Sequence, residues 1–125
     1  MIVDSPALTV LLIEDDQLIR MIAAELLMDL GHTVVEADNA DQAMAALQSA
    51  KVDVLITDLG LPGVSGAEIA ARARELSPQL GIIFATGRSQ APEIPGDGPP
   101  AYLLCKPYDT PGLVAALKAV YVPTK

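Results

Sequence analysis

The sequence has few of the residues on which several classes of protein depend. It contains no tryptophan and one phenylalanine, so it lacks the aromatic platforms on which single-strand nucleic-acid binders stack bases. A single cysteine, Cys105, excludes an internal disulfide and agrees with a reducing compartment. Lys and Arg number 8 against 16 Asp and Glu, and a net charge of −8 repels the phosphates of DNA and RNA. We therefore expect no nucleic-acid partner.

Long apolar runs are missing as well. None approaches the roughly 18 consecutive apolar residues that a membrane helix requires. Residues 1–8 lack the basic stretch followed by an apolar segment that marks a signal peptide. We expect a soluble, cytoplasmic protein without a membrane partner. At 125 residues the chain has the length of one ordinary domain, so residues 1–125 are assigned to a single domain.

Short apolar segments alternate with segments of helical period along the chain. The apolar segments are nearly continuous, which is typical of strands that are covered on both faces. The alternation predicts an α/β fold of the flavodoxin-like type, with a doubly wound five-stranded parallel sheet of order 2-1-3-4-5. The five predicted strands are 8–13, 33–36, 52–57, 81–85 and 101–105.

Four segments carry helical signals. The first helix is predicted to end at Gly31 and to bury one apolar stripe formed by Leu18, Ile19, Ile22, Leu26, Leu27 and Leu30. Capping-box signatures open the second and third helices, at residues 39–42 and 65–68. Thr110 is predicted to cap the last helix, with Pro111 at its first position. The fourth helical slot, 90–100, holds four prolines and two glycines and is predicted to be irregular.

Acidic residues come directly after two of the predicted strands. Glu14, Asp15 and Asp16 follow the first strand, and Asp58 follows the third. These strands are neighbours in the predicted order and flank the point where the winding reverses, so the acids should meet there. Two carboxylates about 4 Å apart repel by roughly 4 kcal/mol at an effective dielectric constant near 20. A Mg²⁺ ion, which binds one or two carboxylates and otherwise water and phosphate, would relieve that repulsion.

Each acid also has an ordinary structural explanation. Asp16 is a suitable N-cap for the first helix, and Asp58 is of a type common in turns. Glu14 and Asp15 alone would be solvated loop acids. However, Thr86 and Lys106 close the fourth and fifth strands and deliver a hydroxyl and an ammonium to the same edge.

These two donors alter the balance between the explanations. On their own, the threonine would be a strand former and helix cap, and the lysine a solvated charge. A phosphoryl group, however, needs donors of both kinds for its peripheral oxygens. The coincidence at one edge favours a site for a metal and a phosphoryl group.

The residues at the strand ends resemble the receiver domains of two-component response regulators over nearly the whole chain. The matching segments are LLIEDD at 11–16, DLGLPGVSG at 58–66, Thr86 with Gly87, and KPY at 106–108. The resemblance implies that Asp58 accepts a phosphoryl group. It also implies that Asp15 ligates Mg²⁺ and that Glu14 does so directly or through water.

Further roles are implied by the same resemblance. The backbone carbonyl of Gly60 would be another metal ligand, and Asp58 would contribute as well. Thr86 and Lys106 would each bond a phosphoryl oxygen, with a cis bond between Lys106 and Pro107 aiming the lysine.

Residues 84–87, FATG, further resemble a group of small stand-alone receivers known as the FAT GUY class, although Arg88 and Ser89 depart from its pattern. The family's usual switch aromatic is replaced by Leu103, with Tyr102 one place early and on the opposite face. Segment 90–100 is the candidate for a replacement switch.

The expected function is acceptance of a phosphoryl group from a histidine kinase or histidine phosphotransferase, without enzymatic turnover beyond self-promoted phosphorylation and hydrolysis. The surface of the fourth strand, the segment after it and the last helix is the expected contact with a downstream protein. Met1 favours a stand-alone regulator over a piece of a hybrid kinase.

Three other functions compete with this one. A phosphatase of the haloacid-dehalogenase type requires a second acid two residues after the nucleophile, and Gly60 occupies that position. In a flavodoxin-like cofactor binder, Glu14, Asp15 and Asp16 would repel the phosphate of the cofactor. The third is an interaction module that is not phosphorylated.

Overall fold

The computed structural model describes residues 7–49, 51–59, 64–86, 101–105 and 109–120. In chain order the elements are β1 (Thr9–Ile13), α1 (Gln17–Asp29), β2 (Thr33–Ala37), α2 (Ala40–Ser49), β3 (Val54–Asp58), α3 (Gly66–Leu76), β4 (Gly81–Thr86), β5 (Tyr102–Cys105) and α4 (Thr110–Val120). All five predicted strands are present, with bounds that differ by one or two residues. Asp58 is the last residue of β3, not the residue after it.

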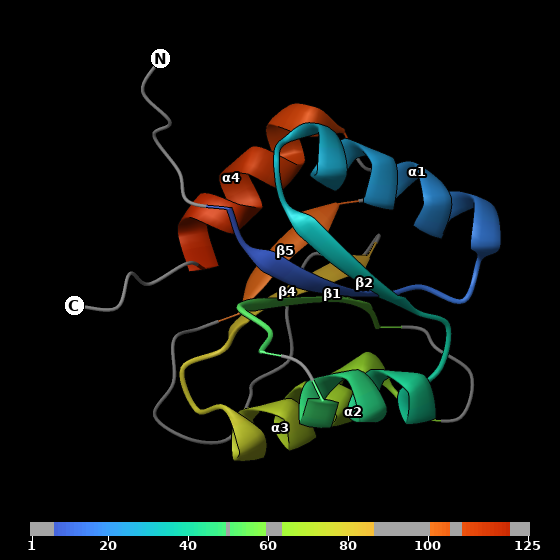
Figure 1. Cartoon of the computed structure of the whole chain (residues 1–125), viewed down its shortest axis with the longest axis vertical. Coiled ribbons are helices and arrows are strands. Elements are labelled where there is room, and N and C mark those ends of the chain that lie inside the picture. The colour runs from blue at the N-terminus through green and yellow to red at the C-terminus, as the bar shows by residue number, and fades with distance from the viewer. Residues whose placement is uncertain (1–6, 50, 60–63, 87–100, 106–108, 121–125) are drawn as a thin grey trace.

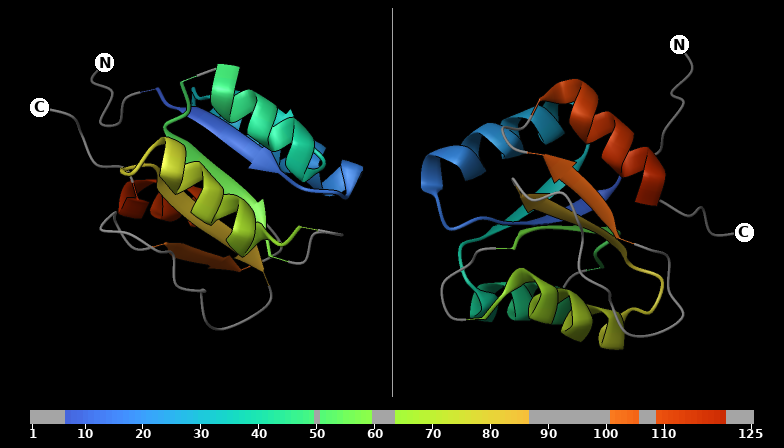
Figure 2. Two further views of the ribbon diagram at one scale, coloured as in Figure 1. Left: turned by 90° about the horizontal axis from the view of Figure 1, so that it is seen from below. Right: turned by 180° about the vertical axis from the view of Figure 1, so that it is seen from behind.

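The strands form one parallel sheet of order β2-β1-β3-β4-β5, so the predicted fold is confirmed. Helices α1 and α4 cover one face of the sheet, and α2 and α3 cover the other (Figures 1 and 2). Segment 90–100, which was predicted to be irregular, lies outside the described residues. Within the described part of the chain, no helix has the length and apolar character to span a bilayer.

Each strand supplies both halves of the core because successive side chains point to opposite faces. In β1, Val10 and Leu12 pack toward α1 and α4, whereas Leu11 and Ile13 pack toward α2 and α3. All four side chains are fully buried, which explains why the strand reads as a continuous apolar run. In β5 the same alternation puts Tyr102 and Leu103 against opposite faces, as predicted.

Helix α1 is rotated relative to the predicted apolar stripe. Its buried residues are Ala23, Ala24 and Leu27, whereas Leu18 and Ile22 are exposed. The prediction that these two side chains face the core is therefore wrong. The two alanines and Leu27 face the core instead, and Leu18, nine residues before Leu27, points to the opposite side of the helix.

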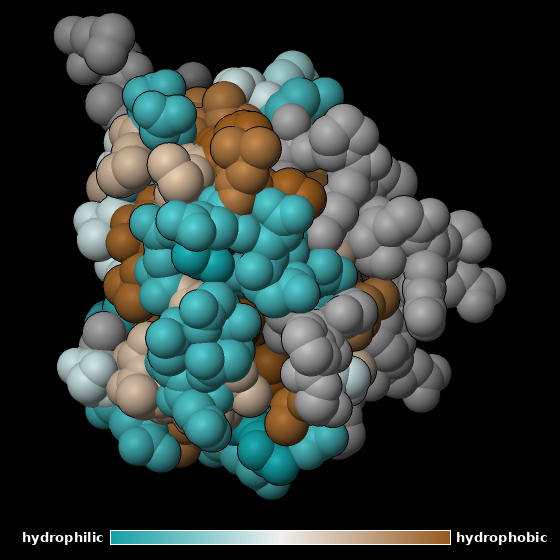
Figure 3. Space-filling model, turned by 90° about the vertical axis from the view of Figure 1, so that its right-hand side faces the viewer, coloured by the Kyte–Doolittle hydropathy of each residue, from teal (hydrophilic) through white to brown (hydrophobic). Residues whose placement is uncertain are grey.

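An exposed apolar surface results from this rotation. We call it the α1 outer face, and it consists of Leu18, Met21, Ile22 and Met28, whose exposed fractions are 66%, 53%, 47% and 53%. In Figure 3, hydrophobic surface gathers toward the top of the molecule, where α1 lies, above a hydrophilic centre.

The ends of the helices mostly follow the predicted signals. Gly31, with φ of 95°, follows α1 as predicted, in a conformation that favours glycine. At α2, Asn39 Oδ1 accepts from the Gln42 N–H at 2.9 Å, and the Gln42 side chain accepts from Asp38. At α3, Ser65 Oγ accepts from the Glu68 N–H at 3.2 Å. Both predicted caps are confirmed.

The cap predicted at Thr110 is wrong. Asp109 Oδ1 accepts from the Gly112 N–H at 2.7 Å, so the cap lies one residue earlier. Thr110 is already the first helical residue and Pro111 the second. The carboxylate of Asp109 reaches the free N–H three residues ahead, which is the task of a cap.

Candidate metal and phosphoacceptor site

Strand register brings the predicted acids to one edge of the sheet. Ile13 at the end of β1 is paired with Thr57 of β3, so the residues that follow, Glu14 and Asp58, are neighbours. The Glu14 N–H donates to the Ala37 carbonyl oxygen at 3.1 Å, which continues the pairing with β2. The backbone therefore holds both acids at the carboxyl end of adjacent strands, where doubly wound sheets bind ligands.

Three of the predicted metal-binding side chains lie together. One carboxylate oxygen each from Glu14, Asp15 and Asp58 lies within 4.8 Å of the other two. Glu14 is buried, Asp58 half-buried and Asp15 exposed. At 4.8 Å and an effective dielectric constant near 20, Glu14 and Asp58 repel by about 3 to 4 kcal/mol. Asp15 adds less because water screens its charge.

This set of donors fits Mg²⁺. All three donors are hard oxygen atoms, and the exposed Asp15 leaves the cluster open to water on one side. A divalent cation there would offset the repulsion among the carboxylates, and its remaining positions would be available to water and a phosphoryl oxygen. The chemistry of the donors therefore agrees with the predicted cofactor.

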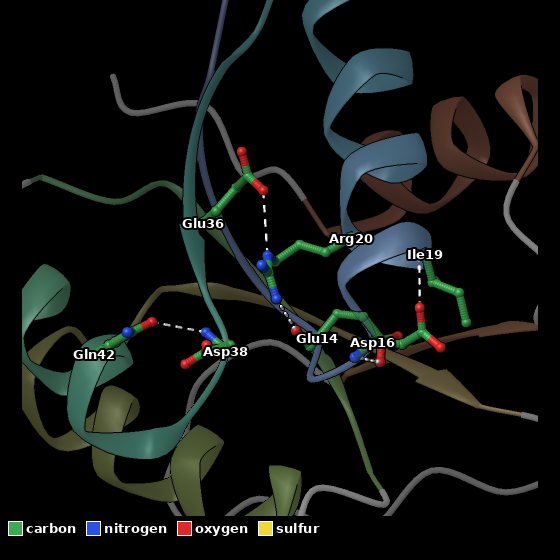
Figure 4. A network of polar contacts seen from close by, with 7 residues as sticks. All are labelled: Glu14, Asp16, Ile19, Arg20, Glu36, Asp38 and Gln42. Carbon is green, nitrogen blue, oxygen red and sulfur yellow. Dashed lines mark hydrogen bonds and ion pairs between the residues drawn. The ribbon is translucent and has the colours of Figure 1, made fainter.

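Asp16 has a different role from its two neighbours. Its Oδ1 accepts from the Ile19 N–H at 3.0 Å, so Asp16 is the N-cap of α1, the structural role for which its position is suited. Its own N–H donates to Glu14 Oε2 at 3.2 Å, which ties the Glu14 side chain to the turn (Figure 4). The cap Asp16 and two of the clustered acids, Glu14 and Asp15, thus share one short turn between β1 and α1.

Two further residues lie against the backbone of Asp58. The hydroxyl of Thr57, which is fully buried, donates to the Asp58 carbonyl oxygen at 3.1 Å. Gly66 begins α3 so close to that strand that a Cβ atom would overlap the same carbonyl oxygen. Neither role was predictable from the residues alone, although Gly66 stands within the segment that resembles the receiver family.

Arg20 is a polar residue of this region that sequence reasoning also missed. Its Nη1 donates to the Glu14 carbonyl oxygen at 2.7 Å, and its Nε lies 3.3 Å from Glu36 Oε1 on β2 (Figure 4). The only signal in the sequence is its place one helical turn after Asp16, which returns it to the same side of the helix.

The remaining predicted site residues lie partly beyond the described chain. Thr86 is the last residue of β4, one place after Ala85, which is paired with Asp58, so its backbone lies at the same edge of the sheet. Gly60 and Lys106 lie outside the described residues, as does the predicted cis bond that follows Lys106.

Comparisons with known proteins agree with this arrangement. The family model described as "Response regulator receiver domain" matches residues 10–118. The response regulator receiver protein CpdR of Brucella abortus is 33% identical over 115 residues, covering 90% of this chain and 96% of the relative. A high-resolution structure of the chemotaxis response regulator CheY4 of Vibrio cholerae has a TM-score of 0.78 and 27% identity, covering 92% of this chain and 99% of that one.

Other relatives are longer than this chain. The phosphate regulon transcriptional regulatory protein PhoB of Pseudomonas aeruginosa is 35% identical over 120 residues, and these cover 90% of this chain but 51% of PhoB. The chain therefore spans about half the length of that relative. A family model that matches most of the chain, a relative of nearly equal length and the shared sheet order lead to one conclusion: the chain belongs to the response regulator receiver domain family.

Proposed function

We propose that Asp58 is the phosphoacceptor and takes its phosphoryl group from a phosphohistidine of a histidine kinase or histidine phosphotransferase. The observation that carries the proposal is the meeting of Glu14, Asp15 and Asp58 at the carboxyl edge of the sheet. In this proposal Glu14, Asp15, Asp58 and the Gly60 carbonyl hold Mg²⁺. Residues 1–125 act as one receiver domain.

The proposed reaction is an in-line displacement at phosphorus. A carboxylate oxygen of Asp58 forms the new bond to phosphorus, the bond between phosphorus and the donor histidine nitrogen breaks, and that nitrogen keeps the electron pair. The bound cation supplies positive charge beside the transferred group. Thr86 and Lys106 bond its peripheral oxygens. Later attack of water on the acyl phosphate releases inorganic phosphate and regenerates the Asp58 carboxylate, so the domain undergoes phosphorylation and hydrolysis without being an enzyme for another substrate.

The short distance along the chain from the acids to α1 suggests where the donor docks. Leu18, the first residue of the α1 outer face, is two residues beyond the Asp16 cap. A donor that presents its imidazole to Asp58 must cover the surface around the acids, including the first turns of α1. Apolar groups that are exposed next to a reaction site are best explained by a partner that buries them. We therefore propose that an apolar surface of the phosphodonor docks on the α1 outer face.

Output and location are also proposals. The surface of β4, the segment after it and α4 is proposed to contact the downstream protein. A cytoplasmic location is proposed as well, in agreement with the single cysteine. The resemblance of residues 84–87 to the FAT GUY class supports a stand-alone receiver.

The phosphoacceptor is tested by incubating the protein with Mg²⁺ and a small acyl phosphate and measuring its mass. Wild type should gain one phosphoryl group, and Asp58→Asn should gain none. Asp16→Asn is the matched control, because asparagine caps a helix as well as aspartate does and the change removes one nearby charge. A mass gain that persists in Asp58→Asn would refute the assignment. A folded wild type that accepts no phosphoryl group would favour an interaction module that is not phosphorylated.

The metal site is tested through stability without any phosphate. A ligand at 100 times its dissociation constant stabilises the folded state by about 2.7 kcal/mol. For a domain of this size that should raise the melting temperature by roughly 10 °C. Asp15→Ala should remove most of that rise, whereas Asp41→Ala, on α2, should leave it intact. A full Mg²⁺ response in Asp15→Ala would contradict the proposed ligands.

The donor surface is tested by comparing two phosphodonors. Ile22→Ser should slow transfer from a phosphorylated kinase at least several-fold and leave the reaction with a small acyl phosphate unchanged. Leu76→Ser is the matched control, because Leu76 is 53% exposed at the end of α3. If both variants react with the kinase at the rate of wild type, the donor docks elsewhere.

A further inference from the structure

We infer that Arg20 is a positioning residue for the acid cluster: its guanidinium fixes the turn that presents Glu14 and Asp15 to the metal. The inference rests on the proposed function, because it assigns Arg20 a purpose at the proposed Mg²⁺ site. Arg20 itself is not proposed to touch the metal or the phosphoryl group.

The geometry joins three elements through one side chain. Arg20 lies on the first turn of α1, and its backbone N–H donates to the Asp16 carbonyl oxygen at 2.9 Å. Its Nη1 donates to the Glu14 carbonyl oxygen at 2.7 Å, just after β1. Its Nε lies 3.3 Å from Glu36 Oε1 on β2. The side chain is 16% exposed, and Figure 4 shows its guanidinium reaching both Glu36 and the Glu14 carbonyl.

The contact with the Glu14 carbonyl affects the direction of the chain between two of the clustered acids. The Glu14 carbonyl belongs to the peptide bond that leads to Asp15, so fixing its direction fixes the start of the next metal-binding residue. The amide of Asp16 in turn holds Glu14 Oε2 at 3.2 Å. One guanidinium therefore restrains the turn from which two of the three clustered carboxylates project. A site that is already ordered before the cation arrives binds it more tightly, because less freedom is lost on binding.

Glu36 contributes to the site through its contact with Arg20. Its side chain is 43% exposed, and ion pairs at that exposure add little stability by themselves. Its carboxylate instead holds the planar guanidinium in the orientation that aims Nη1 at the Glu14 carbonyl. Lysine offers no such fork, since its single ammonium cannot satisfy both partners with the same geometry.

Positioning and simple electrostatics make opposite predictions for Mg²⁺ binding. If Arg20 acted only as a nearby positive charge, its removal would strengthen cation binding, and Arg20→Lys would change nothing. If Arg20 acts by holding the turn, both Arg20→Ala and Arg20→Lys weaken binding. The pair of variants therefore separates the two roles without reference to phosphoryl transfer.

The experiment measures the Mg²⁺ dissociation constant of the full chain by calorimetric titration. Arg20→Ala and Arg20→Lys should each raise it about tenfold, near the lower end of what losing a hydrogen bond to a charged group costs. Glu36→Ala should raise it roughly two- to threefold, and should add nothing in the Arg20→Ala background. Arg72→Ala is the matched control, because Arg72 pairs with Glu68 at 2.6 Å on the exposed side of α3. It should leave the constant unchanged.

A second readout does not need the metal. In metal-free protein, amide hydrogen exchange at Asp16 should speed up in both Arg20 variants, because the turn that carries this N–H is released. Melting curves without Mg²⁺ establish that each variant is folded, and Arg20→Lys serves if Arg20→Ala does not fold.

Three results would overturn the inference. Dissociation constants within twofold of wild type in both variants would do so, as would tighter binding in Arg20→Ala with an unchanged Arg20→Lys. Wild type that fails to bind Mg²⁺ at all would overturn the proposed function and this inference with it. The first two results, obtained with a wild type that binds Mg²⁺, would leave the proposed function standing.

Discussion

Replacing Gly66 with alanine should strain the contact between the start of α3 and the Asp58 backbone. A Cβ atom at this position would overlap the Asp58 carbonyl oxygen, and it would lie 3.0 Å from the carbonyl carbon and 3.1 Å from Thr57 Oγ1. Two of these atoms are backbone. The third belongs to a fully buried hydroxyl that bonds the same carbonyl, so it has little freedom to move. The helix or the strand must therefore shift.

The net loss of stability follows from two opposing effects. Overpacking a filled site costs about 1 to 3 kcal/mol. Alanine returns about 0.5 to 1 kcal/mol relative to glycine in a helix, because the unfolded chain loses freedom. Because two of the overlapped atoms are backbone, the cost lies in the upper half of that range, and the balance is a destabilisation of roughly 1 to 2.5 kcal/mol, or about 4 to 9 °C in melting temperature for a domain of this size. Because the displaced atoms belong to Asp58, Mg²⁺ affinity should fall as well.

The assay is urea denaturation with and without Mg²⁺, with Gly112→Ala as the matched control. A Cβ atom at Gly112 would meet Asp109 Oδ1 at 2.7 Å and Leu104 Cδ1 at 3.2 Å, so it would disturb the cap of α4 without touching the acid cluster. This control should cost about 0.5 to 2 kcal/mol of stability and leave Mg²⁺ binding intact. If Gly66→Ala proved as stable as wild type, α3 would not begin against Asp58 as described.

Two further predictions concern parts of the fold away from the acids. Burial lowers the pKa of His32, and its Nδ1 accepts the Leu8 N–H at 3.1 Å, which a protonated Nδ1 cannot do. The folded pKa thus lies below the ordinary value of 6.5, so His32 stabilises the fold fully above pH 6.5 and progressively less as pH falls toward the folded pKa. Because the chain has one histidine, NMR titration of the ring reads this pKa directly, and a value at or above 6.5 would contradict the contact. Asp109→Ala should cost about 0.5 to 2 kcal/mol in urea denaturation, and Thr110→Ala clearly less; equal losses would mean that Asp109 is not the cap.

The sheet was predictable because its strands carry the information locally. A strand covered on both faces has no polar side, so segments such as 10–13 read as continuous apolar runs between helical segments. The orientation of α1 was not predictable in the same way. Large apolar residues occur round much of that helix, and the periodicity of Leu18 and Ile22 gives no reason to prefer the smaller Ala23 and Ala24 for the core. Tertiary packing decided between the two faces.

Some residues of the candidate site were predictable from the sequence and others were not. Glu14, Asp15 and Asp58 were predictable because each stands at the end of a strand, and topology brings strand ends together. Arg20 was not, since its main partner is a backbone carbonyl, which has no signature in the sequence. The close approach of Gly66 likewise depends on how α3 packs. The roles of Thr86, Gly60 and Lys106 stay predictions.

The position of β1 in the sheet has a consequence for synthesis of the chain. This strand is made first, yet it lies between β2 and β3, so both of its edges are covered only after residue 58 has been added. A nascent chain grows by about 5 to 20 residues per second, and an apolar strand with open edges is prone to aggregate meanwhile. The run from Val10 to Ile13 is followed at once by Glu14, Asp15 and Asp16. Acidic residues that flank an apolar strand oppose its pairing with the same strand of another chain. We therefore expect these carboxylates to limit aggregation of the polypeptide before it has folded.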